Sequence, residues 1–199
     1  MILAIDMGNS NIVVGGIDNK QIYFLERITT HTTRTELEYC MYIKGILDIH
    51  GVKANDIEGA ILSSVVPPLN ITIRNAVKKI LGIECMLVES GMKTGLNILM
   101  DNPKSVGSDM IVDAVAAMEE YPLPLAIIDM GTATTISVVD IHGNYIGGII
   151  HPGLRISLDT LSSKTAQLPQ VNLDMPKKVI AKNTVDSMRS GILFGHAGM

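Results

Sequence analysis

The sequence predicts an α/β fold built from two related halves, each with a mixed β-sheet flanked by helices, and with a cleft between the two lobes. Three observations carry this prediction. The tetrapeptide Ile5-Asp6-Met7-Gly8 recurs as Ile128-Asp129-Met130-Gly131, each copy after a short apolar run. Segments with the periodicity of strands and of helices alternate between the two copies. With 47% hydrophobic and 18% charged residues, the 199-residue chain has ample apolar material for a core.

Each copy of the tetrapeptide opens a meander of three predicted strands. Small polar residues follow the glycine, Asn9-Ser10-Asn11 in the first copy and Thr132-Ala133-Thr134-Thr135 in the second, and a β-branched run comes next. A polar turn at residues 18–20 and at 142–144 precedes the third strand. The predicted strands cover residues 2–5, 12–14 and 21–28, then 125–128, 136–139 and 145–150. Because the context matches on both sides, we interpret the pattern as an internal duplication.

Helix and strand patterns alternate between the two meanders. Gly51 ends the first predicted helix, and Pro67-Pro68 end the strand that follows it. The predicted helices cover residues 35–50, 69–81 and 105–120, and the predicted strands cover 57–66 and 84–88. We expect an N-terminal lobe over residues 1–104 and a C-terminal lobe over residues 105–199.

Charge and cysteine content exclude several classes of protein. The net charge is −4 and no basic stripe is present, so a nucleic-acid partner is not expected. The two cysteines, Cys40 and Cys85, are expected to be reduced packing residues. No basic segment precedes the first apolar run, and no apolar stretch approaches the roughly 20 residues that span a bilayer. The expectation is a cytoplasmic protein without a membrane partner.

The repeated Asp-x-Gly turn suits the binding of nucleotide phosphates. Gly8 and Gly131 allow the backbone to approach a phosphate, and backbone N–H groups of such a turn bind anions. Asp6, at the tip of a strand, has the carboxylate that a hydrated Mg²⁺ prefers. The alternative interpretation is an ordinary β-turn, since Asp, Asn and Gly favour turns. Two copies in matching strands favour phosphate binding, and neither a Rossmann nor a P-loop motif is present.

Together these motifs resemble the type III pantothenate kinases. Asp6-Met7-Gly8-Asn9-Ser10 and the segment from Asp129 to Thr135 are similar to the two phosphate motifs of that family, and Gly107-Ser108-Asp109 is similar to its Gly-x-Asp-Arg motif. The resemblance runs the whole length of the chain. Further matching segments are Lys93-Thr94-Gly95-Leu96, Asp101-Asn102-Pro103, Pro152-Gly153-Leu154, Leu168-Pro169, Lys182-Asn183-Thr184 and Ser190-Gly191.

The resemblance implies a duplicated actin-like (ribonuclease H-like) fold and the ATP-dependent phosphorylation of pantothenate, with Mg²⁺, a monovalent cation (K⁺ or NH₄⁺) and a homodimer. It implies that Asp109 is the general base, that Asp6 binds Mg²⁺ through water and that Asp129 lies near the monovalent cation. It places Gly107, Ser108 and Thr184 at the pantothenate site. The residues that it places at the ATP phosphates are Asp6, Gly8, Asn9, Ser10, Gly131, Thr132, Ala133 and Thr134.

Asp109 has a second interpretation from the residues alone. It lies near the start of a predicted helix, where the helix dipole favours a carboxylate and where most Asp residues serve as helix caps or first-turn acids. His151, just before Pro152-Gly153, has two interpretations as well: contact with a ligand carboxylate, or an ordinary hydrogen-bonded residue at a strand end. Both His151 and Ser137 are unusual residues for their places in the pattern.

The chain departs from the family pattern in two further ways. Met110 stands where the family carries an Arg that would contact the pantothenate carboxylate, and the loss of such a contact costs about 1.5–3 kcal/mol. The family continues for several more elements, so the second lobe is expected to be incomplete. Two alternatives therefore stay open: a catalytically weak or inactive homologue that binds nucleotide or pantothenate in a regulatory role, and a kinase of the same superfamily for another small hydroxylated substrate.

Overall fold

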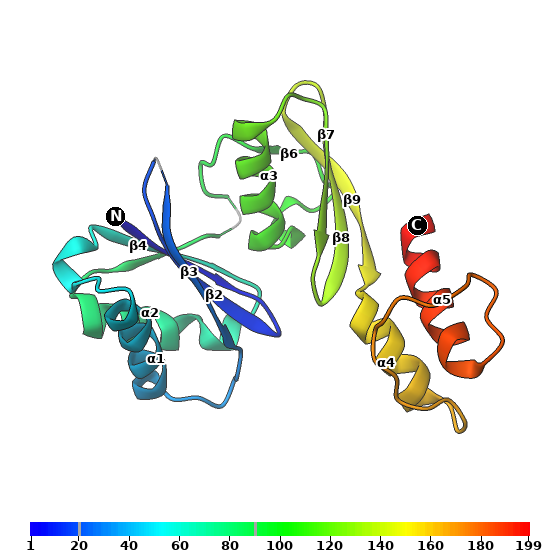
Figure 1. Ribbon diagram of the computed structural model, residues 1–199. Helices are drawn as coiled ribbons and strands as arrows, with labels where there is room; N and C mark the ends of the chain where they lie inside the picture. Colours follow the sequence, from blue (N-terminus) through cyan, green and yellow to red (C-terminus); the bar gives the residue numbers. More distant parts are fainter. Residues whose placement is uncertain (20, 90) are drawn as a thin grey trace. The chain divides into compact units, whose positions relative to one another are not determined.

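The computed structural model describes residues 1–19, 21–89 and 91–199, so Lys20 of the expected first polar turn lies outside the described residues. The chain forms two compact units, Met1–Tyr121 and Pro122–Met199 (Figure 1). Both units combine a sheet with helices, as the sequence predicts. Helix α3 (Ser108–Glu120) contacts a strand of the first unit, and a lobe boundary after residue 104 stays a prediction.

The first unit contains a five-stranded mixed sheet. Its strands are β1 (Ile2–Met7), β2 (Asn11–Ile17), β3 (Ile22–Thr29), β4 (Gly59–Ser64) and β5 (Cys85–Leu87), in the order β3-β2-β1-β4-β5. The three strands of the meander are antiparallel, whereas β4 runs parallel to β1 and β5 parallel to β4. Asp6 is the partner of Ser63 in this register, so the carboxyl ends of β1 and β4 lie side by side.

Helices α1 (Glu36–Ile49) and α2 (Pro67–Leu81) begin and end at recognisable signals. At the start of α1, Thr35 and Glu38 form a reciprocal capping box. Pro67 and Pro68 form the first turn of α2, where a missing backbone N–H costs nothing, so the prolines open this helix as well as closing the strand. Gly82, with φ of 72°, ends α2 in the left-handed conformation. The unit also contains the short strand β6 (Asn97–Ile98) and 3₁₀ turns at Ala54–Asp56 and Pro103–Ser105.

The core of the first unit lies between the sheet and helices α1 and α2 (Figure 1). Leu3, Ile5 and Met7 of β1 are at most 2% exposed, while Asp6 between them is exposed on the opposite face. This alternation follows from the period of two in a strand. Cys40 and Cys85 are buried and free, as expected. The apolar side chains of β1 therefore face the core, and Asp6, the candidate Mg²⁺ ligand, lies on the opposite face of the sheet.

The second unit repeats the meander with β7 (Leu125–Met130), β8 (Ala133–Val139) and β9 (Asn144–Pro152), in the order β9-β8-β7. Both pairs are antiparallel. Helices α4 (Leu154–Lys164) and α5 (Thr184–Gly198) follow and contact one another. Unlike its counterpart β1, β7 is largely exposed, with Ile128 at 61% and Met130 at 64%. Within the described ranges, no helix is both long and apolar enough to cross a membrane.

Candidate functional site

The first Asp-x-Gly turn is held by a residue that directly follows the third strand. The N–H of Gly8 donates to the carbonyl oxygen of Asn11 at 2.9 Å and closes the turn between β1 and β2. Thr30, just after β3, donates its hydroxyl to the Gly8 carbonyl at 2.7 Å and its N–H to the Ser10 carbonyl at 3.0 Å. Asn9 and Ser10 are exposed at the tip. The turn is thus fixed in shape while its small polar side chains face solvent.

Asp6 lines a cavity of about 280 Å³ within the first unit. Ser63 of β4 and Val112 of α3 line the same cavity. The rest of the cavity wall is mostly apolar. A carboxylate at the end of a strand can hold a hydrated Mg²⁺, which needs only one or two protein carboxylates when phosphate oxygens supply the other ligands. The described residues contain no cluster of three or more His, Cys, Asp or Glu side chains that could hold a metal ion by themselves.

Ser108 anchors the start of α3 to the end of β4. Its hydroxyl donates to the Ser64 carbonyl oxygen at 2.9 Å and accepts from the Ser64 N–H at 2.9 Å. The hydroxyl of Ser63 donates to the same Ser108 oxygen at 3.3 Å. Because Ser63 lies beside Asp6 in the sheet, these bonds bring the beginning of α3 to the same end of the sheet as Asp6. A direct contact of Ser108 with substrate stays a prediction.

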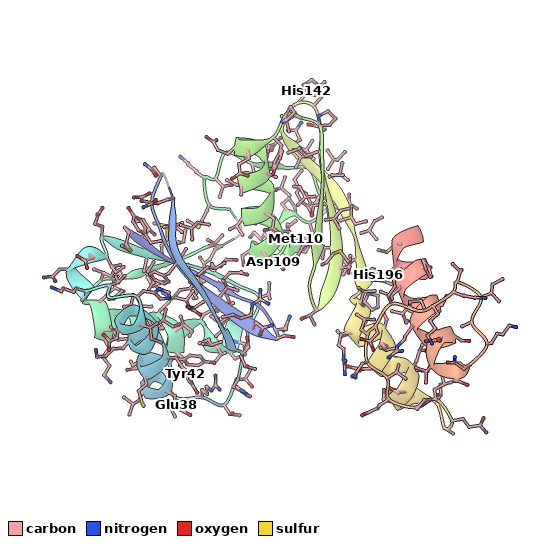
Figure 2. The ribbon with its side chains drawn as sticks, in the orientation of Figure 1. Glu38, Tyr42, Asp109, Met110, His142 and His196 are labelled. Carbon is pink, nitrogen blue, oxygen red and sulfur yellow. The ribbon has the colours of Figure 1, made fainter. Side chains whose placement is uncertain are left out.

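Asp109 lies in the first turn of α3 and is half-buried (Figure 2). Its Oδ1 accepts from the N–H of Met110 at 2.8 Å. A Cβ at Gly107 would lie 2.3 Å from that same oxygen, so a glycine at residue 107 leaves the space that the carboxylate occupies. The carboxylate lies at the N-terminal end of α3, where the helix dipole is positive. Gly107 thus has a physical reason to be glycine, although its contact with substrate stays a prediction.

Met110 is half-buried next to Asp109 (Figure 2). Its thioether has no hydrogen-bond donor, whereas the Arg of the family pattern has five. The side chain therefore cannot make the charge-assisted contact to a carboxylate that the family pattern provides at this position.

The second turn is held by the end of β9. The N–H of Gly131 donates to the Ala133 carbonyl at 3.0 Å, and the N–H of Gly153 donates to the Thr132 carbonyl at 3.0 Å. A Cβ at Gly153 would lie 2.4 Å from the Gly131 carbonyl oxygen and 2.5 Å from that of Thr132. Only a glycine fits so close to the turn. Asp129, Gly131 and Thr132 are exposed, so the carboxylate and the turn are open to a ligand.

Thr134 differs from the exposed residues of the second turn because it is 3% exposed. Its hydroxyl lies 2.7 Å from Nε2 of His196, a residue of α5 that the sequence did not single out. His151 makes a hydrogen bond with the Pro152 carbonyl through Nδ1 at 2.8 Å. Ser137, also unusual in the pattern, has its hydroxyl 3.1 Å from that of Tyr145. The sequence carried no signal for His196, because 62 residues separate it from Thr134.

Thr184 is exposed at the first position of α5, next to the N-cap Asn183. Asn183 accepts a hydrogen bond from the N–H of Asp186 at 2.8 Å. A helix rises about 1.5 Å per residue, so Thr184 lies roughly 18 Å along α5 from His196 and the second turn. Thr184 thus lies at the end of α5 away from the second turn, and its contact with pantothenate stays a prediction.

A family model described as type III pantothenate kinase matches residues 2–199 of the chain. The chain belongs to the type III pantothenate kinase family. A solved structure described as a conserved Baf family transcriptional activator, from Campylobacter jejuni, aligns with a TM-score of 0.59 at 19% identity. The alignment covers 98% of this chain and 75% of the Campylobacter chain. At this identity the likeness shows the fold alone.

Two other solved structures have lower similarity to this member of the family. One, described as an N-acetylglucosamine kinase from Porphyromonas gingivalis, has a TM-score of 0.45 at 15% identity and covers 76% of this chain and 47% of that one. The other, the Ppx/GppA phosphatase of Aquifex aeolicus, has a TM-score of 0.46 at 15% identity and covers 80% and 54%. The family match and the two sheets flanked by helices confirm the predicted fold class, an actin-like α/β fold.

Proposed function

We propose that this chain transfers the γ-phosphoryl group of ATP to the primary hydroxyl of pantothenate, forming 4′-phosphopantothenate in the first step of coenzyme A biosynthesis. The family match supports a kinase of this pathway. One structural observation carries the proposal furthest: hydrogen bonds of Ser108 hold the start of α3, with Asp109, at the same end of the sheet as Asp6 and its turn. A base and a metal-binding carboxylate are then available at one end of one sheet.

The two turns would bind the phosphates of ATP. In the first, Gly8, Asn9 and Ser10 offer a backbone turn and small donors beside Asp6, which would hold Mg²⁺ through water. Bound Mg²⁺ would neutralise charge on the β- and γ-phosphates. In the second turn, the residues proposed at phosphate are Gly131, Thr132 and Ala133, while the hydroxyl of Thr134, which the resemblance also placed there, is hydrogen-bonded to His196. Asp129, exposed one strand position before Met130, would lie near a monovalent cation (K⁺ or NH₄⁺).

Asp109 would act as the general base. Its carboxylate would accept the proton from the pantothenate hydroxyl as that oxygen attacks the γ-phosphorus and the bond to the β-phosphate oxygen breaks. Gly107 leaves room for this carboxylate, and Ser108 fixes the helix that carries it. Transfer of the phosphoryl group depends mostly on positioning and charge neutralisation, which is what a fixed helix start can supply.

Met110 favours a second candidate. This candidate is a kinase of the same superfamily that acts on a small hydroxylated substrate without a carboxylate. Such an enzyme would not need an Arg at this position, where this chain has Met110. The loss of one charge-assisted contact lowers affinity by roughly ten- to a hundredfold, so pantothenate could still be a substrate with a raised KM. A homologue that binds ligand without turnover is the third possibility. A homodimer and a cytoplasmic location remain predictions.

The test is a coupled ADP-release assay with Mg·ATP and K⁺, with and without pantothenate. We expect pantothenate-dependent release that Asp109→Asn lowers about 100- to 10,000-fold, the usual contribution of a general base. Glu119→Gln is the matched control, because Glu119 is an exposed carboxylate at the far end of the same helix. It should leave the rate within about twofold.

The other outcomes separate the candidates. Release with a neutral hydroxylated substrate but not with pantothenate would favour the second candidate, and Met110→Arg should then gain activity with pantothenate. Binding of nucleotide by a folded sample without turnover of any tested substrate would contradict the kinase proposal for this chain.

A further inference from the structure

A hydrogen bond inside the second unit joins its helical part to the strand that leaves the second turn. Oγ1 of Thr134 and Nε2 of His196 are 2.7 Å apart. Thr134 is the second residue of β8, and His196 lies in the last turn of α5 (Figure 2). The Thr134 side of this bond is buried, with Thr134 3% exposed, and His196 is half-buried, so the bond is partly removed from water, where a hydrogen bond is stronger than at the surface. The position of β8 beside the turn therefore depends on α5.

His151 completes this cluster from the neighbouring strand. It is the register partner of Thr134 across β8 and β9. Its ring centroid lies 4.9 Å from that of His196, with the planes at 77°, an edge-to-face contact. A carbonyl oxygen only accepts hydrogen bonds, so Nδ1 of His151 must carry the proton that it donates to Pro152. This bond fixes the ring of His151, which in turn supports the ring of His196.

The cluster adjoins the second turn, because Thr134 and His151 are a register pair of the two strands that meet it. Gly153 follows Pro152 directly, and its N–H holds the Thr132 carbonyl at 3.0 Å. The turn is therefore held from two directions: Gly153 at the end of β9 holds Thr132, and His196 holds Thr134, two residues further along. A change of the Thr134–His196 bond would move the start of β8, where the turn ends, without touching any exposed group of the turn.

We propose that His196 is a positioning residue of the second turn, and that its bond to Thr134 keeps the turn in the geometry that binds the phosphates of a nucleotide. The inference rests on the proposed function, because it assumes that this turn binds phosphate. It assigns His196 no contact with the nucleotide. His196 affects nucleotide binding only through its hydrogen bond to Thr134. Substitution of either residue should therefore lower nucleotide affinity as much as substitution of both.

The experiment measures the dissociation constant of Mg·ADP for the full chain. His196→Phe keeps a ring beside His151 but removes the hydrogen bond, and Thr134→Val removes the hydroxyl in a similar volume. Each should raise the dissociation constant about tenfold, the equivalent of one lost hydrogen bond. The double variant should be no weaker than either single variant. His196→Gln, which can still reach Thr134 with a polar atom, should recover most of the affinity.

Ser190→Ala is the matched control. Ser190 is also buried on α5, and its hydroxyl donates to the Val179 carbonyl, away from the turn. It should lower the stability of the fold and leave nucleotide affinity within about twofold. In turnover, His196→Phe should raise the KM for ATP while kcat and the KM for the second substrate change little.

A second measurement uses the cavity of about 340 Å³ beside the cluster, which both His151 and His196 line. His196→Ala would open this cavity further, and free imidazole added to the solution should restore part of the nucleotide affinity. Additive losses in the double variant, or an unchanged constant for His196→Phe, would overturn the inference and leave the proposed function standing. Absence of nucleotide binding by the unaltered chain would overturn both.

Discussion

At the scale of single residues, Gly107 shows how a motif glycine can serve a neighbouring side chain. Its φ of −62° is open to any residue, so its backbone does not require glycine. The constraint is instead the Oδ1 atom of Asp109, which lies 2.3 Å from where a Cβ would stand. The sequence could identify the motif from its spacing, but the reason for the glycine is visible only when the carboxylate is placed over it.

We therefore expect Gly107→Ala to lower the catalytic rate strongly and to change the stability of the fold little. The added methyl group would displace the Asp109 carboxylate, and a displacement of about 1 Å costs on the order of a hundredfold in rate. The helix start should lose little, because glycine and alanine at an N-cap differ by about 1 kcal/mol or less. The measurement compares kcat with the free energy of unfolding in urea. A parallel fall of both would show that the substitution merely unfolds the start of α3.

Cys85 provides a pH-dependent prediction. Burial raises the pKa of its thiol to about 11. The thiolate is the reactive form, so at pH 8 the folded protein should react slowly with a thiol reagent at Cys85, and fast once unfolded. The thiol ionises at a lower pH in the unfolded chain than in the folded protein. The stability that the neutral thiol contributes is therefore fully present below the unfolded pKa and is lost as pH rises towards 11. Reaction kinetics in a Cys40→Ala background check this, and fast labelling of the folded protein would contradict it.

At the scale of elements, the two copies of the repeat place the same residues in different surroundings. Ile5 is 2% exposed and Ile128 is 61% exposed, although both stand directly before the aspartate of the motif. Helices α1 and α2 cover β1, whereas within the described residues of the second unit β7 remains largely exposed. The sequence could predict both strands from their apolar runs, but it could not predict this difference, because burial depends on which elements pack against each strand.

Ile5 and Ile128 allow a matched comparison of a buried and an exposed residue within one chain. Ile5→Ala should cost about 2 to 5 kcal/mol of the free energy of unfolding, since it leaves a cavity in a packed core. Ile128→Ala should cost well under 1 kcal/mol, since an exposed side chain leaves no cavity. Urea unfolding of the two variants gives both values. Equal losses would mean that β7 is covered in solution by a surface that the isolated unit lacks.

At the scale of the whole molecule, the sequence could predict the duplication, the mixed sheets and the helices of the first unit to within a few residues. It missed α4 and the short strand β6, because neither has a long apolar pattern. Of the candidate site, the turns and Asp109 follow from local motifs, and the tie between Ser108 and β4 does not. Contacts between residues far apart in sequence, such as those of Ser63 with Ser108 and of Thr134 with His196, need the fold.

The exposed position of β7 has a consequence for the behaviour of the protein in solution. The strand is at the end of its sheet in the described chain, so its outer backbone groups can pair with a strand from another molecule. Ile128 and Met130 beside that edge give such pairing an apolar contact. We expect concentration-dependent aggregation that Met130→Lys suppresses, measured by light scattering, because a charged gatekeeper side chain opposes edge-to-edge growth. The strand that presents Asp129 would then also limit how concentrated the protein can become.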